Sequence, residues 1–395
     1  MLGAIASGDS VIKRPLASED AISTVRCLEA LGTQVEWHTL DEVKICPDAW
    51  ASPIGTLDCG NSGTTMRLLS GLIASRPISA TLVGDASLSR RPMKRIADPL
   101  RLMGAGFDGE TPPITIHGAK LTGIDYVSPV ASAQIKSAIL LAGLQASGET
   151  WVREPAPSRD HTERMLQSLG VPILHDGVRG IGLSAGVPRS FEFKVPADIS
   201  SAAFFMTAAT MLPESRVEFT DLSINPTRTG ILDVLGEVGA EIAVDDAHDR
   251  LGEPVAIVTV SSANKLKPFA VSGALIPRLI DEIPVLAVLA TQCDGVSEIR
   301  DARELRVKES DRIEAIAQGL RSMGASVETF EDGMRIEGPT RLRGAAIHAG
   351  HDHRIGMAFA IAGLLADGET VIDGAEAIAT SYPEFERHLW GVAVF

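Results

Sequence analysis

The chain has few aromatic residues and few cysteines. Phe, Trp and Tyr make up only 4% of its 395 residues, so any large core must be built mainly from Leu, Ala, Val and Ile. Its four cysteines, at positions 27, 46, 59 and 293, form no Cys-x-x-Cys pair. Scattered cysteines in a chain of this length are typical of reduced, structural thiols, so we expect a cytoplasmic protein without a disulfide framework.

The chain also lacks an excess of positive charge and a long apolar run. It has 36 basic and 51 acidic side chains, a net charge of −15, and nucleic-acid affinity depends on neutralising phosphates. Apolar runs such as 357–366 are much shorter than a membrane-spanning helix, and no basic residues precede the weakly apolar N-terminus, as they would in a signal peptide. We therefore expect no nucleic-acid partner and no membrane partner. A local basic pocket for a small anion is compatible with the negative net charge.

What the chain does have is length, apolar content and an internal repeat. Hydrophobic residues reach 45%, and 395 residues exceed one average domain, so we expect two domains. A Leu-x-x-apolar-Gly-x-x-apolar pattern recurs about every 70 residues, as expected for a duplicated α/β unit. It predicts a helix that ends at a glycine and is followed by a strand. The glycines of this pattern are Gly32, Gly104, Gly170, Gly239, Gly324 and, in a degraded copy, Gly391.

A second element alternates with this pattern: an apolar segment that begins with polar residues. The apolar parts are apolar nearly all round, which predicts buried helices. The polar starts lie at 59–65, 129–137, 196–202, 276–283 and 350–356. Residues 1–10 resemble the apolar part alone, so we expect the chain to start inside its first repeat, with that polar start missing.

The polar starts suggest binding of anions. The N-terminus of a helix has free N–H groups and a partial positive charge, which favour phosphate or carboxylate. The alternative is ordinary capping by Asn61, Ser132 and Asp198. Two cationic stretches add to the anion hypothesis, although each could be a solvated charged face. One contains Arg90, Arg91, Lys94 and Arg95; in the other, Lys308 and Arg312 would share one face of a helix.

Sites for metals and cofactors are not indicated. His351 and His353 could lie on one side of a strand, but no third ligand follows at a useful spacing. The glycine-rich stretch 60–65 lacks the lysine of a phosphate-binding loop, and the chain has neither a dinucleotide fingerprint nor a Gly-x-Ser-x-Gly elbow. We expect no metal and no cofactor.

Nine short motifs, in order along nearly the whole chain, resemble the 5-enolpyruvylshikimate-3-phosphate (EPSP) synthase family. They are CGNSGTTMR, GDASLSRRPMKR, VASAQIKSA, SRDHTERML, ADISSAAFF, IDEIPVLA, RVKESDR, DHRIGMA and SYPEF. The related UDP-N-acetylglucosamine enolpyruvyl transferases share the fold, but this chain has no counterpart of their reactive-cysteine loop.

The resemblance implies the enolpyruvyl transferase fold, a two-domain inside-out α/β barrel. Six repeated βαβαββ-type units, three per domain, would surround central helices. The N-terminal domain would span 1–195 and the C-terminal domain 196–395, with ligands between them where helix N-termini converge. We expect a monomer.

The resemblance also implies the reaction and its residues. Phosphoenolpyruvate would donate its enolpyruvyl group to the 5-hydroxyl of shikimate 3-phosphate by addition and elimination of phosphate, without a metal. The catalytic group would comprise Asp281 as base, Lys308 and Glu309 in proton transfer, and His353 orienting the site. The contacts to phosphoenolpyruvate would be Gly63, Arg91, Gln134, Arg312 and Arg354. The contacts to shikimate 3-phosphate would be Ser132, Ala133, Gln134, Ser158, Arg159, Asp281 and Lys308.

Departures from the family pattern leave alternatives open. Thr380 replaces a lysine of many members, Ala133 replaces a serine, and the family's N-terminal segment with a catalytic lysine has no counterpart. We therefore expect a folded chain with impaired catalysis. The alternatives are a non-catalytic relative and a UDP-N-acetylglucosamine enolpyruvyl transferase. Gly63, where insensitive members can carry alanine, would leave room for glyphosate.

Overall fold

The computed structural model describes residues 1–392, and the chain divides into two compact units. The first unit contains residues 1–195 together with the short stretch 250–253. The second contains residues 196–249 and continues from Pro254 onward. The expected domains treated everything after 195 as one piece and did not anticipate that residues 250–253, the tip of a later hairpin, would belong with the first unit.

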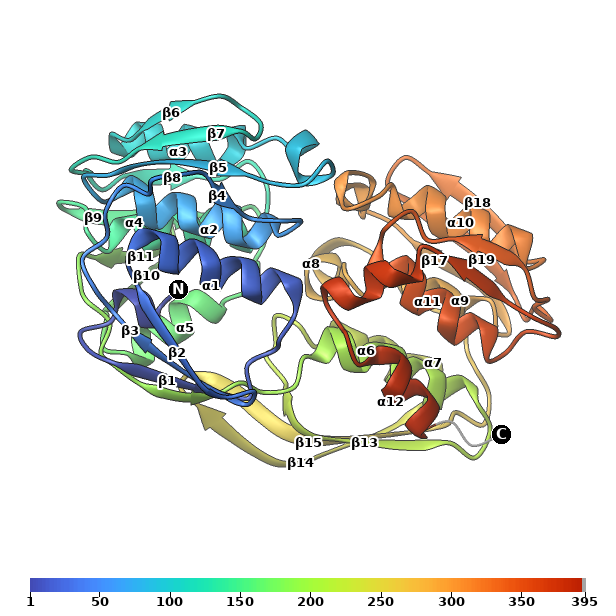
Figure 1. The fold of residues 1–395 in the computed structure, drawn as a ribbon. Coiled ribbons are helices and arrows are strands. Elements are labelled where there is room, and N and C mark those ends of the chain that lie inside the picture. Colours follow the sequence, from blue (N-terminus) through green and yellow to red (C-terminus); the bar gives the residue numbers. More distant parts are fainter. Residues whose placement is uncertain (393–395) are drawn as a thin grey trace. The chain divides into compact units, whose positions relative to one another are not determined.

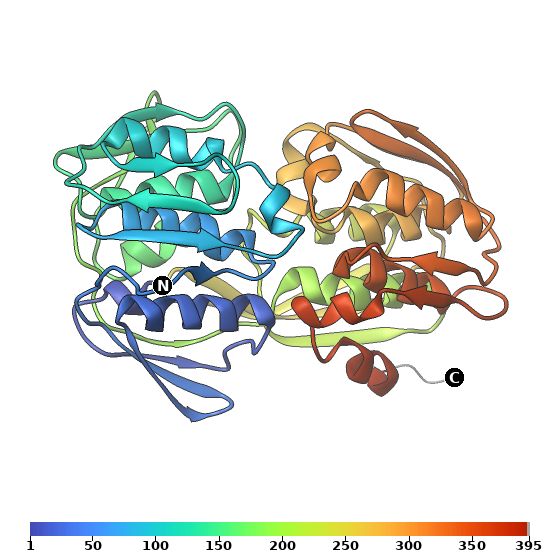
Figure 2. The same cartoon turned by 45° about the horizontal axis from the view of Figure 1, so that its top comes forward.

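Three four-stranded sheets form the outside of the first unit (Figures 1 and 2), in the orders β12-β1-β3-β2, β4-β5-β7-β6 and β10-β11-β9-β8. The strands are β1 (Ser10–Lys13), β2 (Gln34–Thr39), β3 (Glu42–Cys46), β4 (Leu57–Asp58), β5 (Ser79–Val83), β6 (Gly106–Asp108), β7 (Ile114–His117), β8 (Asp125–Val127), β9 (Glu149–Arg153), β10 (Ile173–Asp176), β11 (Gly180–Ser184) and β12 (Glu192–Lys194). The helices are η1 (Gly3–Ile5), α1 (Glu19–Leu31), α2 (Gly63–Ala74), η2 (Leu88–Arg90), α3 (Lys94–Met103), α4 (Ala133–Gly143) and α5 (His161–Ser168).

One strand of this unit comes from a distant part of the sequence. In two of the sheets the first strand of a repeat pairs in parallel with the next one, β4 with β5 and β8 with β9. In the remaining sheet this position beside β1 is taken by β12, with Val11 opposite Glu192. No local sequence pattern could have indicated that β12 takes this position.

The second unit repeats the arrangement with sheets ordered β13-β15-β14, β16-β17-β19-β18 and β20-β21. The strands are β13 (Arg216–Ser223), β14 (Glu241–Arg250), β15 (Glu253–Ser261), β16 (Ala270–Val271), β17 (Gly295–Ile299), β18 (Ser326–Phe330), β19 (Gly333–Gly338), β20 (Ala346–His348) and β21 (Val371–Asp373). The helices are α6 (Ile199–Met211), α7 (Gly230–Val238), η3 (Gly273–Leu275), α8 (Ile276–Leu279), α9 (Ile283–Ala290), η4 (Arg303–Val307), α10 (Arg312–Ser322), α11 (His353–Gly363), η5 (Ala375–Thr380) and α12 (Phe385–Val392).

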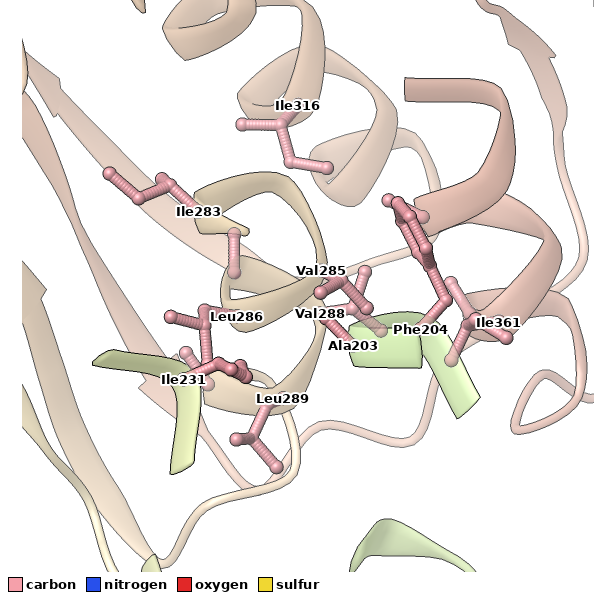
Figure 3. Packing of buried hydrophobic residues seen from close by; sticks show 14 of the residues in the cluster. Ala203, Phe204, Ile231, Ile283, Val285, Leu286, Val288, Leu289, Ile316 and Ile361 are labelled. Carbon is pink, nitrogen blue, oxygen red and sulfur yellow. The ribbon is translucent and has the colours of Figure 1, made fainter. Parts of the chain in front are cut away.

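Apolar helices form the core of each unit, as the sequence predicted. In the first unit α2 and α4 pack so closely that a Cβ on Gly71 would lie 2.1 Å from the carbonyl oxygen of Ala138. In the second unit α9 is buried along its whole length. Figure 3 shows its side chains packed with those of α6, α7, α10 and α11, including Phe204 and Ile361. Each large apolar side chain buried in this way contributes about 1.5–3 kcal/mol.

The recurring glycines end helices in five of six repeats. Gly32, Gly104 and Gly239 cap α1, α3 and α7 with φ between 114° and 119°. Gly170 and Gly324 follow α5 and α10 with φ of 89° and 95°. The prediction was wrong for the degraded copy, because Gly391 lies inside α12. Among residues 1–392, no helix is long and apolar enough to cross a membrane.

Candidate functional site

The predicted site residues fall into two groups, one in each unit, and each group is described by itself. The first half-site comprises the N-terminal ends of α2 and α4, Arg67, Arg91 and the segment 154–160. The second half-site comprises Asp281, the segment 308–312 and the N-terminal end of α11.

The N-terminus of α2 is capped by Ser62, whose hydroxyl accepts from the N–H of Thr65 at 3.2 Å. The alternative of capping by Asn61 is therefore wrong. Asn61 instead donates its amide to Asp85 at 2.6 Å and accepts from the guanidinium of Arg91 at 2.9 Å. The residue next to the cap thus anchors a cation near the start of the helix, which ordinary capping does not require.

Two guanidinium groups flank the start of α2. A Cβ on Gly63 would lie 3.1 Å from Nη1 of Arg67 and 3.4 Å from Nη1 of Arg91. Arg67 donates to the side-chain oxygen of Gln134, and the nitrogen of Gln134 donates to Thr64 at 3.0 Å. The structure therefore brings Gly63, Arg91 and Gln134 together with helix N–H groups, an arrangement suited to a small anion.

Arg67 escaped the sequence analysis because it lies inside an apolar run, and its side chain is buried although charged. The sequence feature that could have identified Arg67 is its charge within an apolar run. The neighbouring cationic run contributes less than expected, since Lys94 is exposed and pairs with Asp98 at 3.2 Å on the same helix.

The start of α4 is held from outside the helix. Ser132 precedes Ala133, the first residue of α4, and its side chain makes no capping bond. Its N–H instead donates to Glu154 at 2.7 Å, and the hydroxyl of Ser158 donates to the same carboxylate at 2.8 Å. Ser132, Ala133 and Ser158 are therefore neighbours. Arg159 follows Ser158 directly, in the segment before α5.

The second half-site is centred on Arg312, whose side chain is 2% exposed. Its Nε and Nη2 donate to Asp352 at 2.8 and 3.3 Å, and its Nη1 donates to Asp281 at 3.2 Å. Glu309 accepts from Nη2 at 2.5 Å. One buried cation thus aligns three carboxylates.

The charges around Arg312 shift its own pKa and the pKa of Asp352. Burial opposes charge on Arg312, but Asp352, Glu309 and Asp281 outweigh that effect and raise its pKa. Burial by itself would raise the pKa of Asp352, but the charge and hydrogen bonds of Arg312 lower it to about 2. Both side chains are therefore ionised at neutral pH.

Lys308 lies in this half-site, although it does not share a helix face with Arg312 as its spacing from Arg312 predicted. It follows η4 with φ −78° and ψ −152°, in extended backbone, whereas α10 begins only at Arg312. The expectation that the two share a helix face is therefore wrong. They meet because the intervening turn brings both to Asp281, with Nζ of Lys308 at 3.5 Å from its Oδ1.

Asp352 was missed by the sequence analysis, although the stretch around it was noted for its histidines. Its side chain is fully buried, accepts from the N–H of Arg354 at 3.0 Å and from the hydroxyl of Ser310 at 2.9 Å. It therefore caps α11 and anchors Arg312 at once. An aspartate directly before an apolar helix was the available signal.

His353 and Arg354 begin α11 beside this cluster. Burial, and then the charge of Arg354, lower the pKa of His353 to about 4, so its imidazole is neutral at pH 7. Arg354 donates to the main-chain oxygen of Asp281 at 3.2 Å. His351 is exposed instead, 3.9 Å from Glu376. No group of three or more potential metal ligands occurs within residues 1–392.

Comparison with protein families gives a match over nearly the whole chain. Residues 1–389 match the model of EPSP synthase (3-phosphoshikimate 1-carboxyvinyltransferase). A protein of Anaeromyxobacter sp. (strain Fw109-5), named 3-phosphoshikimate 1-carboxyvinyltransferase, is 50% identical over 99% of this chain and 92% of its own length. A protein of the same name from Bacillus cereus (strain B4264) is 46% identical over 100% of this chain and 93% of its own.

Solved structures give the same result. The EPSP synthase of Acinetobacter baumannii matches with a TM-score of 0.88 and 42% identity, covering 100% of this chain and 92% of that one. The enolpyruvyl transferase NikO of Streptomyces tendae matches with a TM-score of 0.79 over 99% of this chain and 90% of its own. At 20% identity the latter likeness concerns the fold alone. The expected inside-out α/β fold is thereby confirmed.

Proposed function

We propose a function for this chain from the premise that it belongs to the EPSP synthase family. It is a transferase of the shikimate pathway, and the reaction moves the enolpyruvyl group of phosphoenolpyruvate to the 5-hydroxyl of shikimate 3-phosphate, with release of phosphate. The relatives that share 46–50% of its residues carry the name of this activity.

The reaction moves a proton three times, and one C–O bond forms while another breaks. The 5-hydroxyl loses its proton and its oxygen bonds to C2 of phosphoenolpyruvate, while C3 gains a proton and becomes a methyl group. C3 then loses a proton, the C2–O bond to phosphate breaks, and the enol ether is released with phosphate. The protein must therefore provide a base, an acid and cations for several negative charges.

The first half-site supports a role in anion binding. Arg67, Arg91 and Gln134 surround the first turn of α2, where N–H groups are also available. We assign Gly63, Arg91 and Gln134 to phosphoenolpyruvate. We assign Ser132, Ala133, Gln134, Ser158 and Arg159 to shikimate 3-phosphate. Guanidinium groups suit both ligands because they match the geometry of phosphate and carboxylate.

The second half-site supports a role in proton transfer. Asp281 is the base for the 5-hydroxyl, and Lys308 and Glu309 exchange protons at C3. Lys308 lies 3.5 Å from Asp281, and Glu309 shares the guanidinium of Arg312 with it. Arg312 and Arg354 balance the negative charge of phosphoenolpyruvate, and neutral His353 orients the site.

The observation that carries the proposal is the alignment of Asp281, Glu309 and Asp352 by the single buried guanidinium of Arg312, in a chain of this family. The test is release of inorganic phosphate from phosphoenolpyruvate in the presence of shikimate 3-phosphate. We expect release with this pair, at a low rate because we propose that catalysis by this chain is impaired, and none with phosphoenolpyruvate alone. A crystal structure with both substrates tests the residue assignment, which fails if Arg91 or Asp281 lies away from them.

Two alternatives are distinguished by the same assay. A UDP-N-acetylglucosamine enolpyruvyl transferase would release phosphate with UDP-N-acetylglucosamine instead of shikimate 3-phosphate. A non-catalytic relative would bind shikimate 3-phosphate in a calorimetric titration but release no phosphate. Either result would replace the proposed function.

We propose further that the protein is a cytoplasmic monomer that works on small molecules. The four cysteines are all free, as they are in reducing compartments. Sedimentation velocity with and without the substrates tests the oligomeric state, and a dimer that persists on dilution would contradict it.

A further inference from the structure

A buried carboxylate connects the two stretches of the first half-site that are assigned to shikimate 3-phosphate. The side chain of Glu154 is 8% exposed. Its Oε1 accepts from the N–H of Ser132 at 2.7 Å, at the start of α4, and its Oε2 accepts from the hydroxyl of Ser158 at 2.8 Å. The two stretches are 26 positions apart in sequence (158 − 132), and Glu154 contacts both with different oxygens.

Lys136 holds this carboxylate in place. Its side chain is 4% exposed, and its ammonium lies 3.1 Å from Glu154 and 2.7 Å from Glu163. It also donates to the main-chain oxygen of Ser158 at 3.4 Å. Burial alone would lower the pKa of Lys136, but the charges of Glu163 and Glu154 outweigh burial and raise it, so the side chain stays protonated.

Stability alone does not explain the arrangement. A buried ion pair is seldom the most stabilising choice for a core, because apolar residues of similar volume are often at least as stabilising. A carboxylate that accepts from two separate stretches fixes their distance, which an apolar side chain could not do. Lys136 lies one turn into α4, so it ties the rest of that helix to the same point.

We propose that Glu154, held by Lys136, is a positioning residue for shikimate 3-phosphate: it sets the distance between Ser132 at the start of α4 and Ser158 before α5. It acts through these two residues and not on the reacting atoms. The naming of the ligand rests on the proposed function, whereas the coupling of the two stretches rests on the contacts alone.

The test compares two isosteric variants of the same ion cluster, Glu154→Gln and Glu163→Gln. Both remove one negative charge from beside Lys136. Of the two carboxylates, Glu154 accepts from Ser132 and Ser158, whereas Glu163 contacts Lys136. An amide offers one acceptor oxygen where the carboxylate offers two, so the side chain of the Glu154→Gln variant cannot accept from each stretch with a separate oxygen.

We expect Glu154→Gln to raise the Kd of shikimate 3-phosphate about tenfold in calorimetric titration, as for a lost hydrogen bond to a charged group. We expect Glu163→Gln to change that Kd less than about twofold. The two variants should lose thermal stability by a similar amount. The KM of phosphoenolpyruvate should change in neither variant. Equal changes of Kd in the two variants, or an unchanged Kd in Glu154→Gln, would overturn the proposal.

Hydrogen–deuterium exchange of the unliganded protein separates this proposal from the proposed function. We expect faster exchange in 130–137 and 154–160 for Glu154→Gln, and in neither stretch for Glu163→Gln. Failure of the wild-type protein to bind shikimate 3-phosphate would refute the function, and the exchange result would still decide the coupling. Unchanged exchange in Glu154→Gln refutes the coupling.

Discussion

The two half-sites can be compared through the contacts that hold their arginines. In the first, Arg91 donates to the amide of Asn61 and the hydroxyl of Ser87, and Arg67 donates to the amide of Gln134. In the second, Arg312 donates to Asp281, Glu309 and Asp352.

These contacts indicate two uses of the same side chain. Amide and hydroxyl oxygens orient the guanidiniums of Arg67 and Arg91 beside the start of α2, an arrangement that suits the binding of an anionic ligand. Contacts with three carboxylates fix the guanidinium of Arg312 in place, and its charge keeps Asp352 ionised in spite of its burial. We infer that the first half-site is built to bind and the second to hold acid–base groups in position. Substitutions in each half-site test this contrast.

The largest effect should come from Asp281→Asn. The amide keeps the shape of the side chain but cannot take a proton, so kcat should fall about 10²–10⁴-fold. The Kd of shikimate 3-phosphate should change much less. The measurement is phosphate release at saturating substrates, with calorimetry for binding.

The control for Asp281→Asn is Asp233→Asn, which removes an exposed carboxylate paired with Arg278 at 2.6 Å. It should leave kcat unchanged. A loss of affinity without loss of kcat in Asp281→Asn would place the base elsewhere and remove the basis of the contrast.

The second effect concerns stability and compares Arg312→Met with Arg91→Met. Removing Arg312 leaves Asp352 buried without its cation, which should lower the free energy of unfolding by about 3–5 kcal/mol. Arg91 is only partly buried, so Arg91→Met should cost less stability than Arg312→Met but weaken phosphoenolpyruvate binding about tenfold or more. Urea denaturation and titration of both variants measure this, and similar stabilities would show that the two arginines are used alike.

The third effect is a dependence of stability on pH that arises in the second half-site. The pKa of His353 is about 4 in the folded protein and 6.5 ordinarily, so between these values the unfolded chain binds a proton that the folded protein excludes. Stability should therefore fall as the pH is lowered from 6.5 toward 4. The pKa of Asp352, about 2 against an ordinary 3.8, adds stability above pH 3.8 that is lost below it.

Urea denaturation of wild type and His353→Gln across this pH range isolates the histidine. The variant should lose less stability than wild type between pH 6.5 and pH 4. Parallel curves for the two proteins would mean that His353 is no more buried than in the unfolded chain.

The smallest effect should come from Gly63→Ala in the first half-site. The added methyl group would lie 3.1 Å from Arg67, whose guanidinium must move by a few tenths of an ångström, and in van der Waals contact with Arg91 at 3.4 Å. We expect the KM of phosphoenolpyruvate and the Ki of glyphosate to rise by about three- to tenfold, with stability within about 1 kcal/mol of wild type. An unchanged KM would mean that the start of α2 does not receive phosphoenolpyruvate.

Much of the fold could be predicted from local patterns. The apolar run 66–74 became the buried part of α2, and Gly32, Gly104 and Gly239 end helices with the left-handed backbone that glycine favours. These features depend on residues close in sequence. The position of β12 beside β1 does not, because nothing near residues 192–194 specifies a partner about 180 residues earlier.

The repeat, the buried helices and the kinds of side chain available for chemistry could all be predicted from the sequence, because periodicity and residue type are local properties. Which of these side chains meet depends on the folded chain. Lys308 reaches Asp281 through a turn and not along a helix face, Asp352 holds Arg312, and Glu154 joins Ser132 to Ser158. Each of these contacts satisfies a charge or hydrogen bond that burial would otherwise make costly, and which partner satisfies it depends on the packing of distant segments.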